Sequence, residues 1–254
     1  MNKLSAKTGW EWIRSGFFIF KKRPFFLVNL LFLYMMIAIF IGMIPYIGQV
    51  APVFTMAVFT YLFMSATLMI DRNDQVSFGT LFSLLNRRTF LRLLALSGCY
   101  LLFGLIVAGL SILLEGGPLF AIIIARDGST LSDEQMIKAG YMMLVILALY
   151  VPFFMLTWFA APLIGWRQMS VPKAMFFSFF SVAHAWRSFL IYVLSFFMIG
   201  FVIPSVIGAI IGPLLGGFVG TFVIYLMSVI VTTALYCSFY PTYRDIFGIP
   251  ILNH

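Results

Sequence analysis

The sequence predicts an all-α integral membrane protein with six transmembrane helices in three hairpins, and three observations support this prediction. The 254-residue chain is 63% hydrophobic and 9% charged, whereas an ordinary soluble domain is about 25% charged. The charged residues cluster between four long uncharged runs. The basic residues, moreover, gather on one side of those runs. Such a chain has too little polar surface to cover a soluble core.

The uncharged runs predict how many helices cross the membrane. They cover 24–70, 93–114, 139–166 and 188–243. One crossing of the hydrocarbon needs about 20 apolar helical residues, so the four runs hold two, one, one and two helices in that order. The first run is longer than a signal-peptide core and has no small-residue cleavage site after it. We therefore expect it to remain as the first membrane helix.

The basic residues predict the orientation. Of the 16 Lys and Arg, all but Arg126 and Lys138 fall on one side when compartments are assigned by turns. The other side also holds four acidic residues, Glu115, Asp127, Asp133 and Glu134. The positive-inside rule then places both termini in the cytoplasm. Nucleic acid is not expected as a partner, because the cations lie at the ends of spans and not on a soluble face.

An amphipathic segment precedes the first, third and fifth membrane helices, and each segment ends in Arg-x-Phe-apolar, at 23–26, 88–91 and 187–190. One helical face of the first segment carries Trp10, Ile13, Phe17 and Phe20, and one face of the second carries Phe78, Leu81, Phe82 and Leu85. In the third, Ser170 can cap a helix whose first turn contains Pro172. We expect all three to lie in the cytoplasmic interface with their apolar faces in the leaflet.

These elements form a single membrane domain, 1–254, in three units at 5–70, 71–165 and 166–243. Uncharged turns with Pro and Gly are expected at 44–48 and 212–217. The middle turn is extended into an extracytoplasmic loop at 115–138, where Ser132 and Gln135 can form a capping box before the fourth membrane helix. Common ancestry of the three units stays open, since their residue identity is slight.

The chain resembles uncharacterised bacterial six-helix inner-membrane proteins of the YciC-like kind. The resemblance rests on Gly9-Trp10-x-Trp12, Pro24, the Ile44-Pro45-x-Ile47-Gly48 turn, and Ser170-Val171-Pro172-Lys173-Ala174 leading through Ser178 to Trp186. The chain is also similar to the membrane domain of some glycerophosphodiester phosphodiesterases, although it has no catalytic domain of that kind. The resemblance implies a multi-pass protein of the bacterial inner membrane and brings no activity with it.

Residues typical of catalysis are sparse. The sequence has two Cys, Cys99 and Cys237, both inside predicted spans, and two His; no His, Cys, Asp or Glu pair has the spacing of metal ligands. Phosphate-cradling loops and nucleophile elbows are also missing from the sequence. Asp71 and Asp74 flank Arg72 and are expected in a solvated turn. We therefore expect a protein that is not an enzyme and needs no cofactor or metal.

The cations nearest the membrane are the best candidates for binding. Each can contribute about 1 kcal/mol next to anionic lipid. The candidate headgroup residues are Lys21, Lys22, Arg23, Arg87, Arg88 and Arg187. The leading hypothesis is an inner-membrane protein that binds lipids or other membrane proteins, a second copy of itself included, in membrane organisation or homeostasis.

The alternative is a channel or facilitator for a small or amphipathic substrate. No ionisable residue lies well inside a span, which argues against proton coupling. Neutral polar residues could line a path, and the interior candidates are Asn29, Gln49, Tyr100, Thr157, His184 and Tyr225. Such residues also serve as interhelical hydrogen bonds worth about 1 kcal/mol each. Kinks are expected at Pro152, Pro162 and Pro204.

Overall fold

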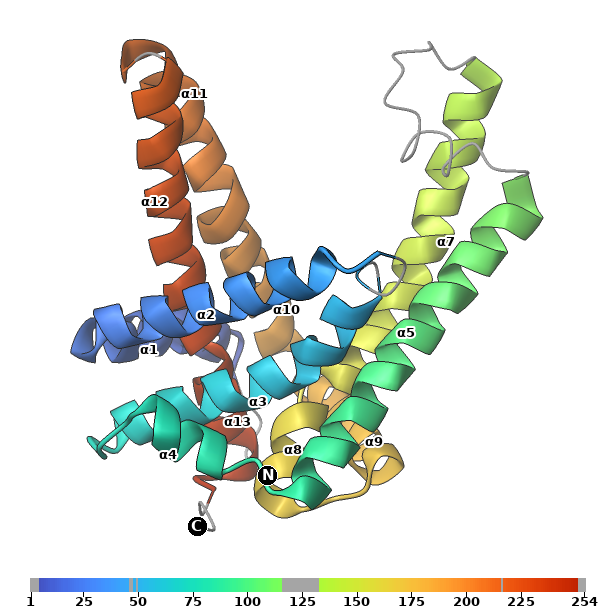
Figure 1. Ribbon diagram of the computed structural model, residues 1–254. Coiled ribbons are helices and arrows are strands. Elements are labelled where there is room, and N and C mark those ends of the chain that lie inside the picture. Colours follow the sequence, from blue (N-terminus) through green and yellow to red (C-terminus); the bar gives the residue numbers. More distant parts are fainter. Residues whose placement is uncertain (1–4, 46–47, 49, 116–132, 216, 251–254) are drawn as a thin grey trace.

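The computed structural model describes residues 5–45, 48, 50–115, 133–215 and 217–250, which form helices and no strand (Figure 1). The first half contains α1 (Ala6–Lys22), α2 (Pro24–Gly42), α3 (Ala51–Asp71), α4 (Phe78–Ser83) and α5 (Arg87–Glu115). The second half contains α7 (Asp133–Thr157), α8 (Ala160–Arg167), α9 (Val171–His184), α10 (Trp186–Phe197), a π-helix (Met198–Val202), α11 (Ile203–Leu215), α12 (Gly217–Cys237) and α13 (Phe239–Phe247). The predicted all-α class is confirmed for these residues.

Six helical stretches in the described residues are long and apolar enough to cross a membrane, as predicted. They are Pro24–Gly42, Ala51–Asp71, Arg87–Leu110, Met143–Arg167, Trp186–Ile210 and Val219–Phe247. The second of these is mostly buried inside the protein, whereas at most a third of each of the other five is buried. The orientation of the termini stays a prediction, and so does the division into three units.

The membrane-length helices pack together at one end of the molecule, which we call the base, and diverge away from it (Figure 1). α2 packs on α3, α5 on α7 and α11 on α12. In Figure 1 the α5–α7 pair and the α11–α12 pair rise from the base in different directions, while α2 and α3 cross between them. The base is formed by α1, the second half of α3, α8 and α13, whose inward residues are almost fully buried. The packed core therefore lies at one end of the molecule.

The first amphipathic segment is the helix α1, and one of its faces is buried in protein. That face carries Gly9, Trp12, Ile13, Gly16 and Ile19 and packs mainly on α10, α12 and α13. Ile13, expected in the leaflet, is 1% exposed, whereas Trp10 is 52% exposed. The apolar face predicted from the sequence is thus partly buried against other helices and partly exposed. The interfacial position of α1 stays a prediction.

Glycine at two positions of this face lets α1 approach its neighbours closely. A Cβ at Gly9 would collide with the backbone oxygen of Ser188 in α10, and one at Gly16 with the backbone of Ser238, between α12 and α13. The Ser188 hydroxyl also donates to the Ser5 carbonyl oxygen over 2.8 Å. The beginning of α1 is therefore fixed against the beginning of α10.

The other predicted interfacial segments are shorter than the first. α4 has six residues and begins with a capping box, in which Thr80 N donates to Ser77 Oγ over 3.2 Å and Ser77 N donates to Thr80 Oγ1 over 2.9 Å. α9 has Pro172 in its first turn as expected, but the Ser170 side chain makes no capping hydrogen bond. α7 begins at Asp133, where the predicted cap places it; Ser132 itself lies outside the described residues.

Proline coincides with irregular helix geometry in two spans. α7 contains Pro152 and stops at Thr157, and α8 resumes at Ala160 with Pro162 in its first turn. The Ser178 hydroxyl fills this break by accepting from Phe159 N over 2.9 Å and donating to the Met155 carbonyl over 2.7 Å. The π-helix ends at Val202, two residues before Pro204, which cannot donate a backbone hydrogen bond. The break between α7 and α8 thus lies just before Pro162, whereas α7 continues as a helix through Pro152.

Candidate functional site

The six candidate headgroup residues form what we call the basic collar: Lys21, Lys22, Arg23, Arg87, Arg88 and Arg187. All six are exposed. Lys21 and Lys22 end α1, Arg23 joins it to α2, and Arg87 and Arg88 begin α5. Arg187 lies in the first turn of α10, with its guanidinium carbon 5.5 Å from the centre of the Trp186 ring. Every collar residue therefore stands at the start of a membrane-length helix.

The collar divides into two groups. Phe26 in α2 contacts Phe78 in α4, with ring centroids 5.1 Å apart, so the residues around 21–23 and 87–88 belong to the same end of the molecule. Arg187 lies instead beside the first turns of α1, because Gly9 abuts Ser188. From Gly9 to Lys22 the axis of α1 covers about 20 Å at 1.5 Å per residue. The structure therefore does not bring Arg187 into the larger group.

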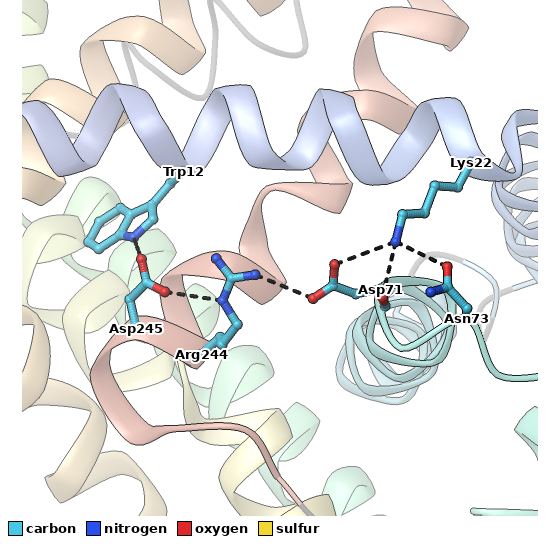
Figure 2. A network of polar contacts seen from close by, with 6 residues as sticks. All are labelled: Trp12, Lys22, Asp71, Asn73, Arg244 and Asp245. Atoms are coloured by element: carbon cyan, nitrogen blue, oxygen red, sulfur yellow. Dashed lines mark hydrogen bonds and ion pairs between the residues drawn. The ribbon is translucent and has the colours of Figure 1, made fainter.

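Lys22 differs from the other collar residues because it belongs to a network of polar contacts (Figure 2). Its Nζ donates to the Asp71 carbonyl oxygen over 3.0 Å and to Asn73 Oδ1 over 3.2 Å, and lies 4.0 Å from Asp71 Oδ1. Asn73 has φ 60°, a left-handed conformation that Asn tolerates. The end of α1 is thereby tied to the end of α3.

The network continues to α13. Arg244 Nη1 lies 3.3 Å from Asp71 Oδ2, and Arg244 Nε lies 3.1 Å from Asp245 Oδ1. Trp12 Nε1 donates to Asp245 Oδ2 over 2.9 Å, which completes the chain of contacts in Figure 2. Three helices distant in sequence are thus joined by two carboxylates. The expectation of a solvated turn was wrong for Asp71 and correct for Asp74, which is exposed.

The sequence did not reveal this network, because the positions of charged residues along the chain do not show which of them meet in the fold. The side on which Lys22, Asp71, Arg244 and Asp245 fall was predictable from their places at the ends of spans. Which cation meets which carboxylate depends on how α1 and α13 pack, and no local pattern specifies that packing. The available signal was the placement of both carboxylates on the side rich in cations.

The interior candidates do not converge. Tyr100 and Thr157 both neighbour Phe153: the Tyr100 ring contacts it at 5.9 Å, and the Thr157 hydroxyl donates to its carbonyl over 2.9 Å. They belong to the α5–α7 pair. Asn29, His184 and Tyr225 are exposed on α2, α9 and α12, and Gln49 lies outside the described residues. Of the five candidates that the structure describes, Tyr100 and Thr157 are the two that share a neighbour.

Metal chemistry finds no support in the part of the chain that the structure describes. Within it, no group of three or more His, Cys, Asp or Glu side chains could hold a metal ion. Cys237 is buried and Cys99 is half-buried, and both are free thiols.

A comparison with known proteins shows the family to which this chain belongs. The chain is 31% identical over 264 residues, covering 97% of its own length and 93% of the relative, to “Probable inner membrane protein BTH_II0599” of Burkholderia thailandensis. No protein-family model matches the chain, and no solved structure matches it. Similarity to YciC-like proteins and to phosphodiesterase membrane domains stays a prediction. This chain is a multi-pass inner-membrane protein and belongs to the family of that Burkholderia protein.

Proposed function

We propose that this protein is not an enzyme and acts by binding membrane lipids, anionic phospholipids above all, or other membrane proteins. One observation supports this most directly: the collar cations other than Lys22 are exposed and have no ion-pair partner within the described residues. An unpaired cation where a span begins is placed to meet a phosphate headgroup. At about 1 kcal/mol per residue near an anionic surface, the group at 21–23 and 87–88 supplies several kcal/mol.

The proposal includes a membrane arrangement. The pairs α2–α3, α5–α7 and α11–α12 are the three membrane hairpins, with both termini in the cytoplasm. α1, α4 and α9 are the interfacial helices that precede them. Exposed phenylalanines on α4 and α9, such as Phe82 and Phe176, would then sink into the boundary between headgroups and acyl chains, as the apolar faces of interfacial helices do. Support comes from the charge distribution and from the exposure of these helices.

The test is retention of anionic lipid by the full-length protein. Native mass spectrometry of protein released from nanodiscs of phosphatidylglycerol and phosphatidylethanolamine would count the lipids that stay bound. The double variant Arg87→Gln/Arg88→Gln should lower the apparent affinity for phosphatidylglycerol about fivefold per residue, the equivalent of 1 kcal/mol each. Lys22 is left unchanged in this test, because its loss would also break the network of Figure 2.

A matched control changes the net charge equally on the side predicted to be extracytoplasmic. Arg126→Gln/Lys138→Gln should leave phosphatidylglycerol retention within twofold of the parent protein. Equal losses in both double variants would mean that net charge, and not the collar, attracts the lipid. No loss in either would leave the collar as a topology signal only.

A further inference from the structure

An apolar groove opens between α2, α3, α4 and α5 and has a volume of about 380 Å³. Its walls include Leu33 and Ile37 of α2, Val58 and Phe59 of α3, Phe82 of α4 and Phe90 of α5. Among the lining residues only Tyr34 and Thr55 have polar side-chain atoms, and the Thr55 hydroxyl already donates to the Pro52 carbonyl over 2.7 Å. A hydrocarbon ligand therefore meets almost no unsatisfied polar group there.

The length of the groove matches one leaflet. Its lining on α2 extends from Leu30 to Ile41, which is about 16 Å along a helix axis. Half of a hydrocarbon core is about 15 Å. A groove of this length with an apolar lining suits a single acyl chain.

One end of the groove is basic. Phe82 and Phe90 line the groove, and Arg87 and Arg88 lie between them in the sequence. The contact of Phe26 with Phe78 brings the beginning of α2 to this end. Both arginines are exposed and make no ion pair in the described part of the chain. An acyl chain in the groove would thus end next to uncompensated positive charge.

We infer that the groove holds one acyl chain of an anionic phospholipid whose headgroup lies against Arg87 and Arg88. This inference rests on the proposed function, because it assigns the collar a specific lipid position. The charge selects the headgroup, and the apolar walls hold one chain out of the bulk bilayer. Such a lipid would exchange more slowly than the lipids around the exposed faces of α5 and α7.

The test uses phosphatidylglycerol with a photoactivatable diazirine on one acyl chain, in nanodiscs with the full-length protein. Peptide mapping after illumination should place the label on groove segments around Leu33 and Val58. Thr55→Phe fills the groove and should reduce that label at least fivefold. Thr60→Phe is the matched control, since Thr60 is on the same helix, also donates to its own helix (Met56 carbonyl, 2.9 Å), and does not line the groove.

Label spread evenly over exposed residues such as Leu102 and Leu144, and insensitive to Thr55→Phe, would overturn the inference. If phosphatidylglycerol retention still fell in Arg87→Gln/Arg88→Gln in that case, the proposed function would stand without the groove. Equal groove labelling by phosphatidylethanolamine, unchanged in that double variant, would overturn the headgroup assignment and the proposed anionic selectivity together. Crosslinks between two copies of the chain at the groove would overturn the inference, because they would show that a second copy and not a lipid occupies the groove.

Discussion

Asp71 joins three helices of the base through a single carboxylate. It ends α3, its Oδ2 lies 3.3 Å from Arg244 Nη1 of α13, and its Oδ1 lies 4.0 Å from Lys22 Nζ of α1. These side chains are about one quarter exposed, so the ion pairs are screened less than those on an open surface. Asp74, three residues further along the chain, is exposed and forms no ion pair in the described part of the chain. The two aspartates thus provide a matched comparison of a paired and an unpaired carboxylate.

Asp71→Asn should destabilise the protein and Asp74→Asn should not. Asparagine keeps the shape of Asp71 but leaves Arg244 and Lys22 without their shared counter-charge, at a cost of about 1 kcal/mol. For a chain of this size that corresponds to a fall in Tm of about 2–4 °C. Thermal unfolding in nanodiscs would measure both variants. Equal Tm values for the two would mean that the network of Figure 2 contributes nothing to stability.

At the scale of helices, the sequence predicts number and position well but contacts poorly. A membrane span must be long and uncharged, so the runs between charged clusters located all six. The close approaches of α1 to its neighbours involve Gly9 and Gly16. Their role depends on α10 and on Ser238, which no pattern within α1 reveals.

Gly9→Ala should loosen α1 from α10. Its Cβ would collide with the Ser188 backbone, and overpacking of this kind costs about 1–3 kcal/mol. Gly104→Ala in α5 is the control, since nothing lies within 4 Å of its Cβ position; alanine should there gain up to about 1 kcal/mol of helix propensity. Proteolysis within α1 and thermal unfolding would distinguish the variants. A Tm of Gly9→Ala at or above that of Gly104→Ala would contradict the close approach.

For the whole molecule, the base and the helices that diverge from it differ in burial. Trp12 of α1, in the base, buries its ring against Phe189 and Tyr192 of α10 at centroid distances of 5.2 and 5.8 Å. The α5–α7 and α11–α12 pairs leave most of their apolar residues unburied, whereas α3 is mostly buried. The collar was predictable because each cation adjoins a span. The groove was not, because four helices supply its walls and every lining residue resembles ordinary lipid-facing sequence.

The arrangement of the whole chain predicts which residues are reachable from each side of the membrane. Ser5 and Ser83 are exposed and separated by two spans, so both should be cytoplasmic; Ile137 is exposed one further span along the chain and should be extracytoplasmic. In intact spheroplasts a membrane-impermeant maleimide should label Ile137→Cys, whereas Ser5→Cys and Ser83→Cys should react only after lysis. The parent protein is the blank, because its two cysteines lie inside spans. The reverse pattern would invert the topology, and different sides for Ser5 and Ser83 would mean that α2 and α3 do not both cross.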